Sequence, residues 1–264
     1  MKRTLFHWSR LALLLSLALF AGTAHAAVPT KAIARGEKFL VDLYDPELRL
    51  LPEFRGSKTF WLYHDNYLAA KLLAEPQPKL AAEIQRSLVR HGATNSGKIE
   101  ILFGEAAQPL PFRTYVLTNV AVVAGKTIRT EIVTEQGLKG WEEYADLLLL
   151  AAFAQATNAP LAARAYFQRA AALWDGRGFH DRVLAKQNPE QKRYATYKLA
   201  LYLLAADRLS QPAPHVAEVR QQLLALQNEA GGWITDYTPE GRPVGQANVE
   251  TTCLALLALK TNFK

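Results

Sequence analysis

The sequence predicts a mainly α fold, an incomplete or reduced α/α toroid of antiparallel helical hairpins with a small inserted antiparallel β-sheet. In the C-terminal stretch, one helix ends near Gln227 and Gly231-Gly-Trp233, and a new apolar helix opens with Glu250 in its first turn. Along the chain, a helix that is apolar on all sides alternates with amphipathic helices, which indicates an inner and an outer layer. No linker-like stretch interrupts residues 27–264, so these are predicted to form a single domain with a β insertion near 98–134.

The first 26 residues have the pattern of a secretory signal peptide. Lys2, Arg3 and Arg10 flank the start of an apolar run over 11–21, and Ala24-His25-Ala26 supplies a cleavage signal. The run is too short to act as a stable membrane anchor, which favours a cleaved signal peptide. The competing interpretation is an uncleaved membrane anchor. We therefore expect export to the periplasm or the extracellular space, with no stable membrane anchor after cleavage.

The composition excludes several function classes. The formal charge of +7 falls when the signal peptide is removed, and no cluster of Lys and Arg suggests nucleic acid as a partner. Cys253 is the single cysteine and lies among leucines, so neither a disulfide nor a catalytic thiol is expected. Metal-ligand, serine-nucleophile and phosphate-loop motifs are missing, so we predict no metal and no cofactor.

Three helices are expected before residue 98. Thr30 can cap the first, which Asp45-Pro46 ends. The second is expected over about 65–74 and ends before Pro76, and the third over 78–90. Together they predict the first helical hairpins.

Residues near 98–134 change in character. The segments 99–103, 113–123 and 127–134 are rich in Val, Ile, Thr and Tyr, and Ala124-Gly125 can form a turn between the last two. We therefore expect a small antiparallel sheet here.

The remaining chain returns to helical patterns. Residues 141–157 are apolar nearly all round, which predicts a buried helix, whereas 161–174 are amphipathic. Asn188-Pro-Glu-Gln191 resembles a capping box that opens a helix ending near Leu209. Two further helices, over 215–227 and 249–259, complete the set.

Acidic side chains near helix ends are the candidate catalytic groups. Asp65, Glu143 and Glu250 lie at three expected helix starts, each beside aromatic or polar residues. If these helices run parallel, the acids surround one pocket, where carboxylates can bind sugar hydroxyls or move protons. The structural alternative is strong, because acids in a first helical turn also cap the helix and interact with its dipole.

Asp175 is the fourth candidate acid. It is expected near a helix C-terminus, where the dipole disfavours an acid, although an Asx turn before Gly176 explains it equally well. His180 beside Asp181 can form an acid–base pair, or can simply be solvated in a loop.

The candidate substrate-binding side chains are mostly aromatic, because aromatic faces stack on sugar rings. Tyr and Trp at helical spacing are, however, more often part of a core. The candidates are Trp61, Tyr67, Trp141, His180, Tyr194, Trp233, Asp236, Tyr237 and Asn248.

Three resemblances bear on function. Gln227-x-x-x-Gly231-x-Trp233 resembles the Gln–Trp repeat of terpenoid cyclase and prenyltransferase toroids, but the Asp-rich motif of the cyclases is missing, so their chemistry is not implied. Trp141-Glu-Glu-Tyr-Ala-Asp146 and Trp174-Asp-Gly-Arg-Gly-Phe179 resemble the six-hairpin glycosidase and sugar-epimerase superfamily. Asn248-Val-Glu-Thr-Thr252 and the segment from Tyr44 to Tyr67 resemble a group of exported prokaryotic proteins of that kind, a group without an assigned activity. The resemblance implies a carbohydrate ligand at the inner-helix ends.

We therefore expect an exported protein that binds an oligosaccharide or polysaccharide, and we leave open whether it also cleaves the glycan in the manner of a glycoside hydrolase or lyase. One alternative is a non-catalytic helical scaffold for protein partners. Residues 162–171 resemble the second helix of a tetratricopeptide unit, but no second copy follows at the required period. Another alternative is a lipid or isoprenoid pocket, which predicts an apolar cavity with the acids pointing elsewhere. The oligomeric state is not predicted.

Overall fold

The computed structural model describes residues 30–94, 97–105, 110–181, 193–210 and 213–261. The predicted signal peptide and the capping box at 188–191 lie outside these residues. No helix in the described ranges is long and apolar enough to cross a membrane.

Helices form the larger part of the described chain. They are a helix over residues 30–43, α2 (Tyr63–Leu73), α3 (Pro78–Arg90), α4 (Ala145–Gln155), α5 (Pro160–Ala171), α7 (Thr196–Arg208), α8 (Val216–Ala225) and α9 (Val249–Lys260), with two short 3-10 helices, η1 (Ile99–Phe103) and η2 (Trp141–Glu143).

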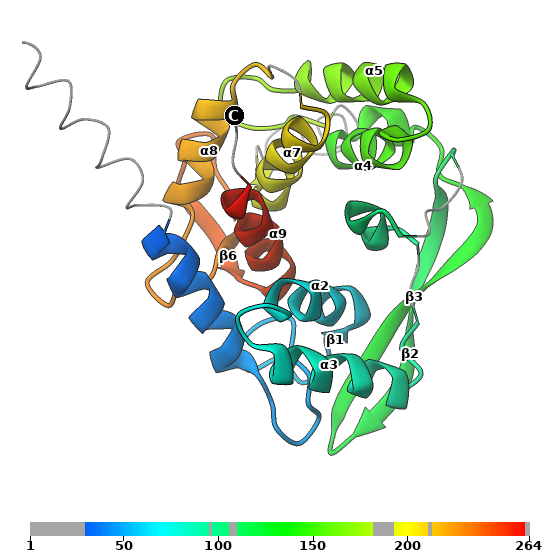
Figure 1. Ribbon diagram of the computed structural model, residues 1–264, viewed down its shortest axis with the longest axis vertical. Helices are drawn as coiled ribbons and strands as arrows, with labels where there is room; N and C mark the ends of the chain where they lie inside the picture. Colours follow the sequence, from blue (N-terminus) through cyan, green and yellow to red (C-terminus); the bar gives the residue numbers. More distant parts are fainter. Residues whose placement is uncertain (1–29, 95–96, 106–109, 182–192, 211–212, 262–264) are drawn as a thin grey trace, which may run out of the picture.

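The helices lie in two layers. Helices α2, α9, α7 and α4 pack side by side in that order, and each of α2, α4 and α7 packs against the helix that follows it in the chain (Figure 1). The inner helices α4, α7 and α9 bury side chains at consecutive positions, whereas the outer helices α3, α5 and α8 bury only one face. This difference follows from their sequences, because a helix that is apolar all round is stable only when it is covered on most sides.

A three-stranded sheet closes the side of the molecule away from α8. Its strands are β1 (Trp61–Leu62), β2 (Arg113–Val123) and β3 (Lys126–Gly137), in the order β1-β3-β2 (Figure 1). Strands β2 and β3 form an antiparallel hairpin, whereas β1 pairs with β3 in parallel through Trp61 and Ile128. The parallel pair fixes the point at which α2 begins.

A second sheet lies between the ends of α7 and α9. Strands β4 (Tyr194–Ala195), β5 (Ile234–Tyr237) and β6 (Pro243–Ala247) pair antiparallel in that order. Strand β4 leads directly into α7, and β6 is followed by Asn248 and α9, so this sheet sets the starts of two inner helices.

The prediction of a mainly α, incomplete α/α toroid is wrong. The structure is mixed, with 49% helix, 20% strand, 8 helices and two small sheets over its described part. The physical reason is that the long β2–β3 hairpin pairs along its whole length and, through β1, joins the helical layer as a structural side of its own. The second sheet was not predicted, because its strands are very short.

Two local predictions also need correction. Residues 99–103, expected as a strand, form η1, because Ile99, Glu100 and Ile101 are buried consecutively instead of alternately and Gly104 ends the turn in a left-handed conformation. The helix expected from Trp141 begins as η2 and is interrupted at Tyr144, whose backbone is extended.

The helix over 30–43 packs against segments near the other end of the chain. Gln227 Nε2 donates to the carbonyl of Ala32 at 2.8 Å, and Arg35 donates to the carbonyl of Glu229 at 3.1 Å. Gly36 faces Trp233 and Leu256 so closely that an added Cβ would lie 2.7 Å from the Trp ring. The two ends of the described chain therefore share one core.

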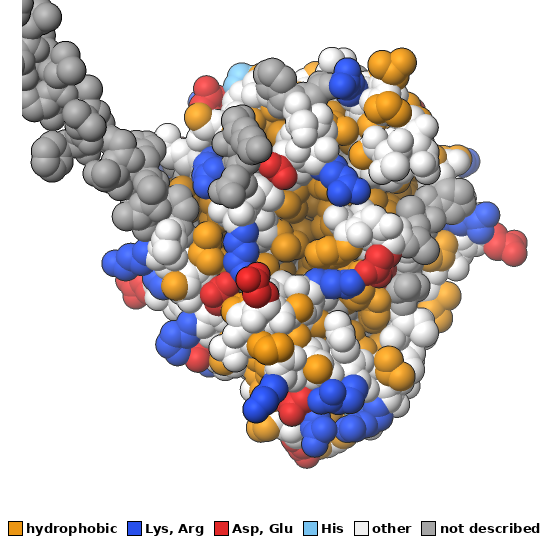
Figure 2. Space-filling model, viewed as in Figure 1, with side chains coloured by type: hydrophobic (Ala, Val, Ile, Leu, Met, Phe, Trp, Pro, Cys, Tyr) orange, Lys and Arg blue, Asp and Glu red, His pale blue; other side chains and the backbone are white. Residues whose placement is uncertain are grey.

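One face of the molecule carries both hydrophobic and charged side chains. Hydrophobic side chains gather in the middle of the face, and Lys, Arg, Asp and Glu surround them (Figure 2).

Candidate functional site

The loop before α2 fixes the direction of Asp65. Asn66, the next residue, accepts a hydrogen bond from Leu51 N at 2.7 Å and donates to Leu51 O at 2.9 Å and Leu62 O at 3.0 Å. With Asn66 bound to the loop, Asp65 points into the protein and is 0% exposed.

The first turn of α9 is held against the same loop. Asn248 caps α9 by accepting from Thr251 N at 2.9 Å, and Val249 N donates to the carbonyl of Glu53 at 2.8 Å. These contacts bring Glu250 and the side chain of Glu53 next to the first turn of α2.

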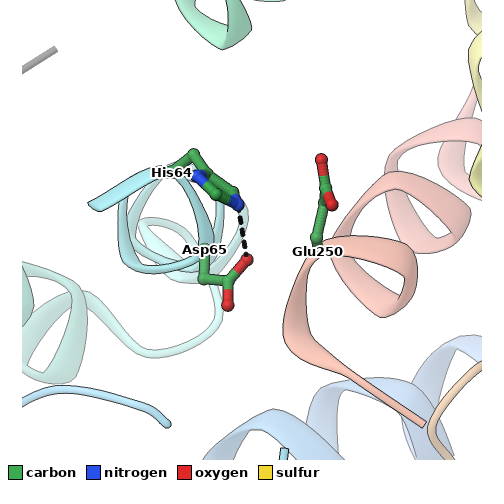
Figure 3. Close-up of side chains that lie close together, drawn as sticks. All are labelled: His64, Asp65 and Glu250. Carbon is green, nitrogen blue, oxygen red and sulfur yellow. Dashed lines mark ion pairs between the residues drawn. The ribbon is translucent and has the colours of Figure 1, made fainter. Parts of the chain in front are cut away.

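His64, Asp65 and Glu250 meet where the two first turns face each other, and we call them the first-turn cluster (Figure 3). His64 Nε2 lies 3.4 Å from Asp65 Oδ1. One ligand atom from each residue lies within 4.8 Å of the other two, so the cluster has a composition and size suited to a metal ion. His64 and Glu250 are partly exposed, whereas Asp65 is covered.

The carboxyl group of Asp65 is buried, and neither of its oxygens has a hydrogen-bond partner among the described residues. Burial raises the pKa of Asp65 well above its usual range, and the nearby carboxylates of Glu250, Glu53 and Glu131 raise it further. Burial also raises the pKa of Glu53, and Glu250 adds to this. Such an accumulation of buried acid is typical of functional sites.

The first turns of α7 and α4 continue this polar region. Tyr197, in α7, donates to Asp146 Oδ2, in α4, at 2.9 Å. Burial raises the pKa of Tyr197 well above its usual range, and the charges of Asp146 and Glu250 add to this. Tyr197 therefore connects the α9 side of the region with the α4 side.

A buried ion pair supports these two turns. Lys198 Nζ contacts Asp181 and also lies 3.7 Å from Asp146 Oδ1. Asp181 Oδ1 in turn accepts from Ala145 N at 2.9 Å, at the start of α4. Lys198 and Asp181 are 4% and 2% exposed, so they hold the helices in place and do not face a ligand directly.

Asp65, Glu250, Tyr197 and Asp146 thus come from the first turns of four adjacent helices. Carboxylates and a phenol in one region can accept hydrogen bonds from hydroxyl groups, transfer protons or bind a cation. Asp65 and Glu250 were both candidate catalytic acids, and the structure brings these two together.

Asp175 lies in a different place and has a structural role. It accepts from the backbone N–H groups of Arg177 and Gly178 at 3.0 and 3.1 Å, and from Tyr194 Oη at 2.5 Å. Burial raises its pKa, but these hydrogen bonds outweigh burial and the pKa is lowered overall. The Asx-turn alternative therefore describes its geometry.

Glu143 lines a surface pocket and is not part of the first-turn cluster. The pocket has a volume of about 330 Å³, and Glu142, Leu148 and Arg169 also line it. Arg169 forms an ion pair with Glu142 at 3.1 Å. A role of Glu143 in function stays a prediction.

Most of the predicted stacking residues lie in the core. Trp61, Trp141, Trp233 and Tyr237 are 2%, 8%, 0% and 1% exposed, so none of them presents a ring face to a ligand in this conformation. Trp233 Nε1 donates to the carbonyl of Leu223 at 2.8 Å.

The other predicted binding residues are dispersed. Tyr67 stacks on Tyr63 with 5.6 Å between ring centroids, in the α2 region. Tyr194 is buried, contacts His180 edge-on and stands opposite Tyr237 in the β4–β5 pair. Asp236 belongs to β5, and Asn248 caps α9.

His64, Glu53 and Tyr197 were not among the residues predicted for the site. His64 is adjacent to Asp65 at an expected helix start. Tyr197 lay inside a helix expected to open at 188–191, whereas α7 begins at Thr196, so its place in a first turn was not predicted. Glu53 lies in an irregular loop and approaches Glu250 only through tertiary contacts, so no sequence pattern indicates it.

Comparison of the chain with protein-family models, curated proteins and solved structures found no match.

Proposed function

We propose that this protein is exported and that it binds, and then cleaves, an oligosaccharide or polysaccharide at the first turns of α2, α9, α7 and α4. The observation that carries the proposal is the convergence of Asp65, Glu250, Tyr197 and Asp146 in one region. Sugars present many hydroxyl groups, and an array of carboxylates and a phenol can satisfy them by hydrogen bonds.

Glu250 is the carboxylate that we assign to the sugar. It is partly exposed, whereas Asp65 behind it is completely covered. Hydrolysis of a glycosidic bond uses carboxyl groups on both sides of the scissile bond, and Glu53, half-buried next to Glu250, is the candidate second group.

The arrangement of the acids favours this proposal over the lipid-pocket alternative. The lipid-pocket alternative predicts an apolar cavity and acids that point away from it. Here Asp65 points toward Glu250, and Glu250 lies close enough to Tyr197 to influence its pKa (Figure 3).

A thermal-shift screen against oligosaccharides and polysaccharides tests the proposal. A ligand present at about a hundred times its Kd stabilises a protein by about 2.7 kcal/mol, which shifts the melting temperature measurably. We expect a saturable shift that Glu250→Gln and Tyr197→Phe each reduce, and product release that chromatography detects.

Glu142→Gln is the matched control, because Glu142 is an exposed carboxylate of the surface pocket, in an ion pair with Arg169. The control should retain the full shift. A flat response of the wild-type protein across a broad panel, or a shift that Glu250→Gln leaves intact, contradicts the proposal.

A further inference from the structure

We propose that His64, Asp65 and Glu250 bind a divalent transition-metal ion of the first row, such as Zn²⁺ or Mn²⁺. The three residues offer one imidazole nitrogen and two carboxylate oxygens within 4.8 Å of one another. Metal–ligand bonds of about 2.1 Å place neighbouring ligand atoms roughly 3.4 Å apart in a tetrahedral site. His64 Nε2 and Asp65 Oδ1 already have this separation, at 3.4 Å, so only Glu250 needs to move closer (Figure 3).

The environment of Asp65 is the independent observation that points to a ligand. Its side chain is 0% exposed, and neither oxygen accepts a hydrogen bond from any described residue. The neighbouring Asn66, equally buried, uses its amide group in three hydrogen bonds. A buried carboxylate that accepts no hydrogen bond is costly, and a cation held between it and the His64 ring compensates its charge.

The surrounding charges also favour a cation. The carboxyl groups of Glu53 and Glu131 lie near Asp65, and in their ionised form they add negative charge to the region. Lys98 lies nearby, but its ammonium group is 3.6 Å from Glu131 and is engaged there. The positive ends of the α2 and α9 dipoles oppose a cation, but these are partial charges, whereas the carboxylates carry full ones.

The ligand set indicates which ion binds. Ca²⁺ and Mg²⁺ prefer oxygen ligands throughout, whereas an imidazole with carboxylates suits Zn²⁺, Mn²⁺ and similar ions. Three protein ligands leave at least one coordination position for water or another ligand, as in catalytic metal sites. Because His64 and Glu250 are the partly exposed members, we expect that position on their side.

The inference concerns the site of the proposed function and deepens it, because a bound cation can coordinate sugar hydroxyls or a water molecule. Metal binding does not require that the ligand be a sugar, so the two proposals are tested separately.

The test is isothermal titration of the full, chelator-treated protein, without an affinity tag, with Zn²⁺, Mn²⁺ and Ca²⁺ alone. We expect saturable binding of about one transition-metal ion per chain and weaker binding of Ca²⁺. His64→Ala and Glu250→Gln should each lower the affinity at least about tenfold. His215→Ala is the matched control, because His215 forms an exposed pair with Glu218 at 3.0 Å elsewhere, and it should bind as the wild type does.

Asp65→Asn guards against a variant that fails to fold, since it keeps the shape of the side chain and removes the buried charge. This variant should fold and should lose the rise in melting temperature that the metal gives the wild type. Absence of saturable binding to the wild type, or unchanged affinity in His64→Ala, overturns the inference.

The outcomes also separate the two proposals. A sugar-dependent shift that persists in chelator without metal binding overturns this inference alone. Metal binding with no response to any sugar supports this inference and contradicts the proposed function.

Discussion

Asp65 and Asp175 show how far the environment decides what an aspartate can do. Both were candidate acids, and both lie close to the end of a helix. Asp175 accepts hydrogen bonds from two backbone N–H groups and from Tyr194, and its pKa is lowered. Asp65 accepts none from the described residues, and burial raises its pKa. The first is a stabilising turn residue, and the second is an unsatisfied group that needs a proton or a ligand.

The contribution of Asp175 to stability depends on pH in a direction that follows from its pKa. Because the folded-state pKa lies below the ordinary value of 3.8, its contribution is present above that pH and is lost as the pH falls through the folded-state pKa. Asp175→Asn should therefore lower the free energy of unfolding by about 1 kcal/mol at neutral pH. The difference from the wild type should become small near the acid limit of the folded state.

Urea unfolding at neutral and acidic pH measures this difference. Asp42→Asn is the control, since Asp42 is exposed and pairs with Lys38 at 2.7 Å, four residues away on the same helix. It should change stability by less than about 0.5 kcal/mol. A loss in Asp175→Asn that is the same at both pH values contradicts the prediction.

At the scale of elements, the approach of the 227–233 loop to the first helix explains the glycine at 231. Gly231 has a positive φ of +96°, and a Cβ there would lie 2.3 Å from the carbonyl oxygen of Arg35. Gly125, in the turn between β2 and β3, also has a positive φ, +75°, but no atom lies within 4 Å of its Cβ position. Both positions therefore have a backbone conformation that strains a residue with a Cβ, and they differ in the packing around that Cβ.

Alanine substitution at these two glycines separates the cost of a positive φ from the cost of the close contact with the first helix. Gly125→Ala should lower the free energy of unfolding by about 1–2 kcal/mol, the cost of a left-handed conformation for a residue with a Cβ. Gly231→Ala should cost about 1–3 kcal/mol more, because the backbone of the first helix must move away. Denaturant unfolding of both variants measures this, and equal losses would show that the close approach is unimportant.

The elements differ in how well the sequence predicts them. The helices with long periodic patterns, such as 78–90 and 249–259, were predicted close to their observed bounds because apolar spacing and end residues agree. Residues 99–103 were misassigned because Ile and Phe are common in strands, whereas burial against α4 determines their conformation. Strand β6 was missed because Pro243 and Gly245 suggest a loop.

At the scale of the whole molecule, the helix over 30–43 packs one end of the described chain against segments near the other end. It covers Trp233 and Leu256. Its Arg35 donates to the carbonyl of Glu229, and its Ala32 carbonyl accepts from Gln227 Nε2. A domain of this size is stable by only about 5–15 kcal/mol, so the loss of one packed helix is a large fraction of the total.

A chain that begins at Tyr44 should therefore lose cooperative unfolding and expose Trp233. Tryptophan emission, thermal unfolding followed by circular dichroism, and dye binding measure this. A chain that begins at Ala27 is the control and should retain one sharp transition. If both truncated chains unfold with the same midpoint, the first helix is not part of the core.

The candidate site was predictable only in part, because tertiary packing brings its residues together. The sequence placed Asp65 and Glu250 in first turns, and the packing of α2 against α9 brings them together. The contributions of Glu53 and Glu131 come from a loop and a strand, so they depend on contacts that no local pattern encodes. The prediction of the fold class was wrong because the hairpin β2–β3 forms a whole side of the molecule.

The contacts of the first helix also impose an order of events during synthesis. The hydrogen bond between Gln227 and Ala32 joins residues 195 positions apart. At a synthesis rate of about 5–20 residues per second, the apolar side of this helix waits roughly 10–40 s before its partner leaves the ribosome. A chaperone has that interval in which to bind this helix, so a helix that is made early reaches its final place late.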